Sequence, residues 1–131
     1  MHKRNRLFVT LSLVYALIGG LVGIAWLYDP SLVPGDVASL HGHLMLLGFV
    51  GMMIYGVGLH VLPRFSGNPL FSERLANWQL YVSNVGLWLM SAGWVMTFNH
   101  LVLIGGAVSW AGIGMFALNI MLTVKIHGPA G

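Results

Sequence analysis

An all-α integral membrane protein, arranged as a four-helix up-down bundle, is the fold class that the sequence predicts. Two observations lead to it. The 131 residues are 57% hydrophobic and only 7% charged, which is too apolar for a soluble domain of this size. The chain also has four stretches of roughly 20 or more residues without a charged side chain, the length that crosses the hydrocarbon core. We therefore expect one membrane domain over residues 1–131, in contact with lipid.

The four predicted spans leave few residues over. They cover about residues 7–28, 37–62, 75–98 and 100–124. A basic N-terminus before the first apolar run resembles a signal peptide, but the run is too long and lacks a small-residue cleavage site. We therefore predict a retained span. The links between spans are short and contain Pro, Gly, Asp or Asn, so adjacent helices are expected to pack antiparallel.

All six basic side chains fall on one side of the predicted bundle. They lie before the first span, between the second and third, or after the fourth: Lys3, Arg4, Arg6, Arg64, Arg74 and Lys125. The links on the other side carry Asp29 and Asp36 and no Lys or Arg. The positive-inside rule therefore predicts that both termini are cytoplasmic. Because topology explains the basic residues, we expect no nucleic-acid partner.

Three histidines gather at the predicted outer end of the bundle. His41 and His43 open the second span, and His100 opens the fourth. Ionisable side chains at membrane depth usually mark function. The chain has no cysteine, so any metal must bind through His or Met. His60 lies about 25 Å away at the cytoplasmic end of the second span, where a boundary histidine without a cofactor is the favoured interpretation.

The side chains of His41 and His43 point about 200° apart on a helix. One helix therefore cannot aim both at one ion, and the pair suits two different interfaces. Met45 and Gly48 share the helix face of His41, and small residues beside an apolar wall would let a flat macrocycle approach the backbone. The alternative is that these histidines are hydrated at the headgroups, or bonded to backbone carbonyls, with no cofactor.

Catalytic residues are not predicted. The sequence has no Ser/His/Asp arrangement, no phosphate-binding glycine loop and no paired carboxylates. Glu73 is the only glutamate, and both aspartates lie in outer links. Hydrolytic acid–base chemistry therefore has no candidate residues.

The second and third spans contain the motifs of a known family. The run Leu40-His41-Gly42-His43-Leu44-Met45, then Pro63 with Gly67, and then Asn77-Trp78-Gln79-Leu80 resembles helices two and three of the catalytic subunit of heme-copper oxidases and nitric oxide reductases. In that family a His-Gly-x-x-Met segment opens an outer-side helix and supplies an axial ligand to the low-spin heme. The resemblance implies that His41 is this ligand.

A second resemblance concerns His43. The tenth helix of the oxidase subunit carries a His-x-His pair, one histidine for each of two hemes, and His41-Gly42-His43 has that form. The subunit consists of three arcs of four helices around a pseudo-threefold axis, and this chain is one arc long. The other family histidines lie on helices that one copy lacks, and no outer arginine is present to pair heme propionates. A complete binuclear centre is not expected, and enzymatic activity is left open.

The resemblance implies a heme b held between subunits of a homo-oligomer, first a trimer and next a dimer. His41 of one subunit and His43 of its neighbour would be the axial ligands. Met45 and Gly48 would line the site, and His100 would support a ligand or replace one. Such a protein would carry electrons in the plasma membrane of a prokaryote and exchange them with a redox partner or a quinol.

Two alternatives remain open. One is a protein that senses or handles a gas such as nitric oxide or oxygen, or that binds copper. In the copper version His41, Met45 and His100 would be the ligands, since imidazole and thioether suit copper. The other alternative is a structural membrane subunit without a cofactor.

Overall fold

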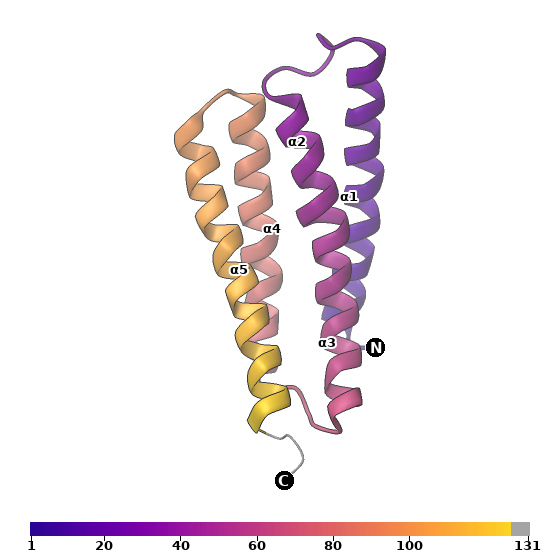
Figure 1. Cartoon of the computed structure of the whole chain (residues 1–131), viewed down its shortest axis with the longest axis vertical. Helices are drawn as coiled ribbons and strands as arrows, with labels where there is room; N and C mark the ends of the chain where they lie inside the picture. The colour runs from indigo at the N-terminus through magenta and orange to yellow at the C-terminus, as the bar shows by residue number, and fades with distance from the viewer. Residues whose placement is uncertain (127–131) are drawn as a thin grey trace.

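Residues 1–126 of the chain are described by a computed structural model in which the regular elements are helices. The elements are α1 (Lys3–Tyr28), α2 (Val37–His43), the π-helical segment η1 (Leu44–Gly51), α3 (Met52–Ser66), α4 (Glu73–Val95) and α5 (Asn99–Ile126). Because α2, η1 and α3 follow one another without a break, four rods stand side by side (Figure 1). The described part of the chain contains no strand, so it is all-α as predicted.

Among residues 1–126, three rods are long and apolar enough to cross a membrane. They are Lys3–Tyr28, Val37–Ser66 and Asn99–Lys125. The chain is therefore an all-α membrane protein. The 23 residues of α4 would extend to about 35 Å, but polar side chains such as Glu73, Arg74 and Asn84 lower the hydropathy of this helix. Membrane crossing by α4 stays a prediction.

The helix boundaries differ from the predicted span limits by up to four residues, and two of these differences have a local cause. The second rod continues past Leu62 to Ser66, because Pro63 lies in the last turn and removes only one helical hydrogen bond there. Gly67 then ends the rod in the left-handed conformation (φ 73°), with its N–H bonded to carbonyls of that last turn. The third rod ends at Val95, before the predicted residue 98, because residues 96–98 form the turn into α5.

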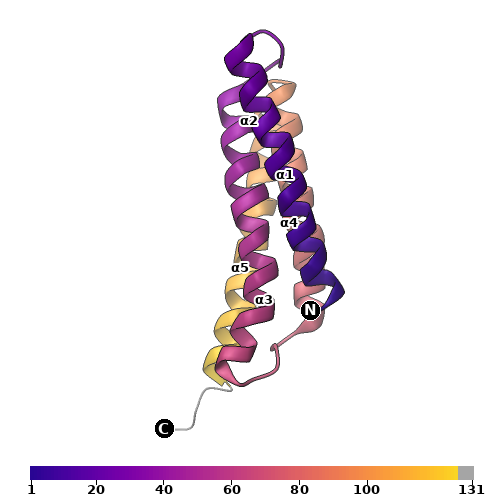
Figure 2. The ribbon, with the colours of Figure 1, turned by 90° about the vertical axis from the view of Figure 1, so that its right-hand side faces the viewer.

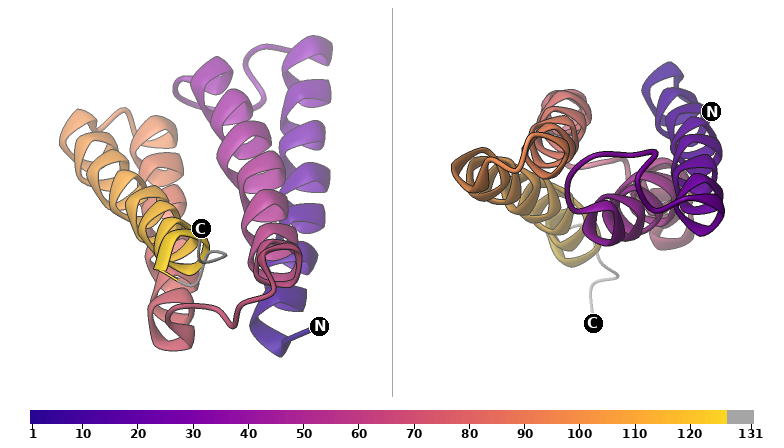
Figure 3. Two further views of the ribbon diagram at one scale, coloured as in Figure 1. Left: turned by 60° about the horizontal axis from the view of Figure 1, so that its bottom comes forward. Right: turned by 90° about the horizontal axis from the view of Figure 1, so that it is seen from above.

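The bundle consists of two helical hairpins. α1 packs along η1 and α3, while α4 packs along α5 in the most extensive contact of the molecule. Seen from above, the two pairs lie side by side (Figure 3). A Cβ at Gly86 would collide with Ser109, and one at Gly105 would lie 2.5 Å from the backbone N of Met90. Glycine thus allows the close approach of α4 and α5.

The core lies between the hairpins, and the outer surface is apolar. Phe8, Met52 and Leu87 are almost completely buried where α1, α3 and α4 face one another. Large apolar side chains such as Leu27 and Trp110 are mostly exposed on the outside of the rods. A surface of this kind suits lipid rather than water.

The link between the first two rods fixes the start of α2 against the end of α4. The N–H of Asp36 donates to Trp94 O at 3.1 Å. Gly35 has a φ of 86°, and a Cβ there would collide with the same carbonyl. The Asp36 carboxylate caps α2 by accepting bonds from the N–H and hydroxyl of Ser39. This anchoring positions the histidine-bearing first turns of α2.

Candidate functional site

His41 lies on α2 with its ring against the backbone of α1. Its Nδ1 is 2.8 Å from Gly19 O. A Cβ at Gly23 would lie 2.8 Å from Cε1 of the same ring, so Gly23 is what allows the ring to come this close. The half-buried imidazole borders an open groove of about 370 Å³. This His41 groove is lined by Gly20, Gly23, Ile24, Trp26, Leu27 and His41.

The contact with Gly19 determines which ring nitrogen of His41 carries the proton. A carbonyl oxygen only accepts, so Nδ1–H must donate to Gly19 O. In the neutral ring Nε2 then keeps its lone pair. Metal-bound histidines typically donate their other N–H to a carbonyl or carboxylate, which orients the ring. The Gly19 carbonyl orients the His41 ring in the same way.

His43 faces a different helix. Its Nδ1 lies 2.9 Å from Ser39 O and, by the same argument, donates to it. The ring packs on Trp94 of α4, with centroids 4.4 Å apart and planes inclined by 40°. His41 thus contacts α1 while His43 contacts α4, as their helical spacing predicts. One copy of the chain does not present both rings to one ion.

Asp36 is the acidic group at this end of α2. Hydrogen bonds from the Ser39 hydroxyl and N–H hold the pKa of Asp36 below its ordinary value, and the charge of nearby His43 acts in the same direction. The carboxylate therefore caps α2 in its charged form at neutral pH.

Met45 and Gly48 occupy different surroundings although they share one helix face. The Sδ of Met45 would lie 2.8 Å from a Cβ at Gly19, so the thioether borders the same residue of α1 as His41. A Cβ at Gly48 would lie 2.7 Å from Cβ and Cγ of Tyr15. Since Tyr15 fills that space, Gly48 allows η1 to approach α1 and does not border the His41 groove.

His100 stands apart from the other two outer histidines. It is exposed in the first turn of α5, where its ring meets Phe98 edge-on with centroids 5.9 Å apart. Over the described residues 1–126, no three His, Asp or Glu side chains lie close enough together to hold a metal ion. A single copy therefore does not assemble His41, His43 and His100 into one ligand set.

The helix changes its winding directly after His43. The eight residues of η1 form a π-helix, which is rare and often found at functional sites. Sequence patterns do not predict this segment, because its residues also fit an ordinary apolar helix.

His60 lies toward the opposite end of the second rod. Arg64 Nη1 donates to His60 Nδ1 and to His60 O, each at 2.8 Å. Both residues border a polar cavity of about 400 Å³ together with Arg4, Asn68 and Glu73. His60 thus has protein partners of its own and does not share surroundings with His41.

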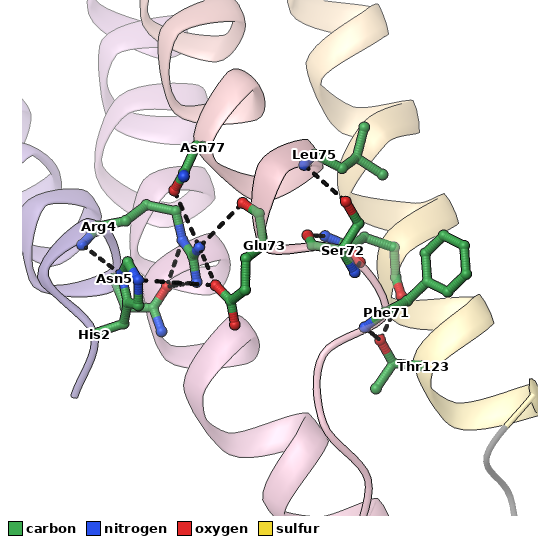
Figure 4. A network of polar contacts seen from close by, with 10 residues as sticks. His2, Arg4, Asn5, Phe71, Ser72, Glu73, Leu75, Asn77 and Thr123 are labelled. Carbon is green, nitrogen blue, oxygen red and sulfur yellow. Dashed lines mark hydrogen bonds and ion pairs between the residues drawn. The ribbon is translucent and has the colours of Figure 1, made fainter.

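A buried arginine near the N-terminus is a feature that sequence reasoning missed. The Arg4 side chain is only 4% exposed and pairs with the Glu73 carboxylate. It also donates to Asn77 Oδ1 at 3.2 Å and to Asn5 Oδ1 at 3.0 and 3.1 Å (Figure 4). The sequence suggested only a topological role for this charge. The one available signal was that Glu73 is the only glutamate, at the start of α4.

A second polar network joins α1 to α4 further along the bundle. The Tyr15 hydroxyl donates to Asn84 Oδ1 at 2.5 Å and accepts from Trp88 Nε1 at 2.7 Å. Asn84 Nδ2 donates to Leu80 O within α4. This network fixes the Trp88 indole against α1.

Comparison with known proteins gives one weak similarity, to a heme-copper oxidase subunit. No protein-family model matches the chain, and no solved structure matches it. The chain is similar to cytochrome c oxidase subunit 1 of Corynebacterium diphtheriae, with 26% identity over 139 aligned residues. The alignment covers 98% of this chain but only 23% of that protein, so the chain spans about a quarter of its relative's length. The similarity supports a relationship between this membrane protein and the heme-copper oxidases.

Proposed function

We propose that the chain binds a b-type heme and transfers electrons in the membrane, as a relative of subunit 1 of the heme-copper oxidases. The observation that supports this most is the geometry of His41. Its Nδ1–H is engaged by Gly19 O, and its Nε2 keeps a lone pair on a side chain that borders the His41 groove. His41 is also the residue that matches the family's axial ligand.

The residues around the His41 groove fit a flat apolar group. Gly20 leaves the α1 backbone uncovered, since a Cβ there would meet nothing within 4 Å, while Ile24 and Leu27 provide apolar walls. The groove is open on one side, so a second protein surface is needed to cover such a group. When bound between two imidazoles, a heme supplies one-electron transfer.

The second histidine ligand would come from another copy of the chain. His43 contacts Trp94 on α4, on the side of the helix away from His41. In a ring of subunits, each second rod can present His41 to one neighbour and His43 to the other. A trimer would reproduce three arcs of four helices; a dimer is the next arrangement. We propose that all four rods cross the plasma membrane of a prokaryote with both termini cytoplasmic, and that a redox partner or quinol exchanges electrons with the heme.

Histidine substitutions test this function. We expect His41→Ala and His43→Ala each to lower the heme content of the purified protein to less than about a tenth of the wild-type value, because each removes an axial ligand. His60→Ala is the matched control on the same rod and should retain heme. Loss of heme in the His60 variant alone would mean that the heme binds at the His60 end of the rod and not at His41. Retention in both His41 and His43 variants would overturn the proposal.

Copper binding is the second candidate, since Met45 Sδ and the His41 ring border the same residue, Gly19. Imidazole and thioether ligands suit copper. Elemental analysis separates the two: iron with heme absorption supports the cytochrome, whereas stoichiometric copper without heme supports the copper site.

A further inference from the structure

We propose that the seam between α1 and α4 binds one anionic phospholipid in the leaflet that borders the N-terminal end of α1. The site is separate from the His41 groove, which lies toward the other end of α1 and faces α2. The proposal therefore does not depend on heme binding.

Two hollows along this seam form one continuous groove. The first has a volume of about 450 Å³ and the second about 200 Å³. Leu7, Leu80 and Tyr81 line both, so the hollows adjoin. We call this space the α1/α4 groove.

The α1/α4 groove is held open at two fixed points. α1 and α4 run side by side (Figure 2), but their backbones contact each other far less than those of α1 and α3 or of α4 and α5. The Arg4–Glu73 ion pair joins them at one end, and the Tyr15–Asn84 hydrogen bond joins them further along. The groove is the space between the ion pair and the hydrogen bond, and protein side chains do not fill it.

The end of the groove near the N-terminus is cationic. His2, Lys3 and Arg4 line it. Among the described residues of this end, Glu73 forms an ion pair with Arg4, and His2 Nε2 lies 3.9 Å from the same carboxylate. The exposed ammonium of Lys3 therefore remains to bind a phosphate, as basic residues at the membrane surface do for anionic headgroups.

The inner part of the groove is apolar. Leu11 and Val85 form its walls, and Trp88 stands at its far end with its Nε1–H engaged by Tyr15. The Asn84 amide there is already bonded to Tyr15 and to a carbonyl of its own helix. This stretch offers contact to an acyl chain and no polar group to a ligand head.

The charge distribution selects the occupant. A cation at the rim above an apolar trough complements a phosphate headgroup with an attached acyl chain. A neutral isoprenoid quinone would leave the Lys3 charge without a partner. A second copy of the chain seated groove to groove would bring two Lys3 ammonium groups together, and such like-charge contact is unfavourable. An anionic phospholipid satisfies both parts of the groove.

Native mass spectrometry of the full-length protein with added lipid tests the proposal. We expect dioleoyl-phosphatidylglycerol to bind at least about fivefold more tightly than dioleoyl-phosphatidylcholine, the difference that one surface cation supplies. Lys3→Gln should remove this preference. Arg6→Gln removes one positive charge from the same helix, at a residue that does not line the groove. This variant should keep the preference for phosphatidylglycerol.

Filling the apolar part gives an independent readout. Val85→Trp should reduce phosphatidylglycerol occupancy, whereas Val57→Trp, at an exposed position on α3, should not. Equal binding of the two lipids, equal loss in the Lys3 and Arg6 variants, or unchanged occupancy in Val85→Trp would each overturn the proposal. A changed oligomer mass with unchanged lipid binding would instead assign the seam to a second copy. Displacement of the lipid by a neutral quinone, equally in Lys3→Gln, would assign the groove to the quinone.

Discussion

Two glycines of α1 decide how His41 is held. Gly19 supplies the carbonyl that accepts the Nδ1 proton, and Gly23 leaves the space that the ring enters. Gly20 lies between them, yet a Cβ there would meet nothing within 4 Å. Substitution by alanine should therefore affect the His41 ring differently at these three positions.

Gly23→Ala should displace the His41 ring and lower heme content. The added methyl would lie 2.8 Å from the ring, and overpacking of this kind typically costs about 1–3 kcal/mol. Heme content and the optical spectrum of the purified variant measure the effect. Gly20→Ala is the control and should resemble the wild type. If both variants retain the wild-type spectrum, the ring position does not matter for the cofactor.

The candidate site could be predicted from the sequence in part. Helical spacing was enough to predict that His41 and His43 contact different neighbours. It could not show that Tyr15 fills the space at Gly48, or that Arg4 is buried on Glu73, because both depend on how α1 is rotated against its neighbours. The role of these histidines as ligands stays a prediction.

Helix ends and seams set the position of the site at the scale of elements. Asp36 starts α2, and the same residue binds the end of α4 through its N–H. The pKa of Asp36 lies below its ordinary value because Ser39 donates two hydrogen bonds to the carboxylate, with a smaller effect of His43. With a lowered pKa in the folded state, the cap stabilises α2 above the unfolded pKa and this stabilisation is lost as the pH falls through the folded pKa.

Acidification should therefore loosen the first turn of α2. We expect amide hydrogen exchange at Ser39, corrected for its intrinsic pH dependence, to accelerate as the pH drops below the ordinary aspartate value of 3.8. Asp36→Asn keeps an uncharged cap and should not show this acceleration. The same pH dependence in both proteins would contradict the role of Asp36.

The α4–α5 seam should be intolerant of side chains at its glycines. Gly86→Ala would place a methyl against Ser109, and we expect it to lower the free energy of unfolding by about 1–3 kcal/mol. Gly106→Ala meets open space and should be neutral or stabilising by up to about 1 kcal/mol, since alanine favours the helix. Unfolding in denaturing detergent, followed by circular dichroism, compares them. Equal stability of the two variants would show that the contact between α4 and α5 can accommodate the added methyl group.

Element positions were more predictable than element ends. The charge-free apolar runs coincide with the four rods, three of which are apolar enough to cross a membrane. The helix continues four residues beyond the predicted span limit at Leu62, since a proline in the last turn does not stop a helix that Gly67 caps one turn later. The π-helical winding of η1 had no signal in the sequence, as hydrophobic pattern does not report a change of hydrogen-bond register.

The whole molecule places its basic residues at one end. The N-terminus, the link between α3 and α4 and the last turn of α5 share this end, while the link between α1 and α2 lies at the other (Figures 1 and 2). Three rods have the length and apolarity to span a membrane, and the polar start of α4 lies at the basic end. The positive-inside rule predicts from this arrangement that the basic end of the bundle faces the cytoplasm.

Cysteine labelling tests the orientation, and the chain offers a background without cysteine. Ser31→Cys, in the exposed link before α2, should react with a membrane-impermeant maleimide in intact cells. Pro69→Cys, in the link before α4, should react only after the membrane is permeabilised. The reverse pattern would mean that the protein has the opposite orientation in the membrane. Labelling of both sites in intact cells would mean that the second rod, which separates them, does not cross the membrane.

Optical spectroscopy shows whether a heme is bound through His41 and His43 of neighbouring subunits. Oxidised and dithionite-reduced spectra of the detergent-purified protein would be recorded together with its iron content and oligomer mass. We expect sharp low-spin bands, about one iron per chain in a closed ring, and a mass of more than one subunit. A monomeric protein without iron or heme absorption would contradict this expectation.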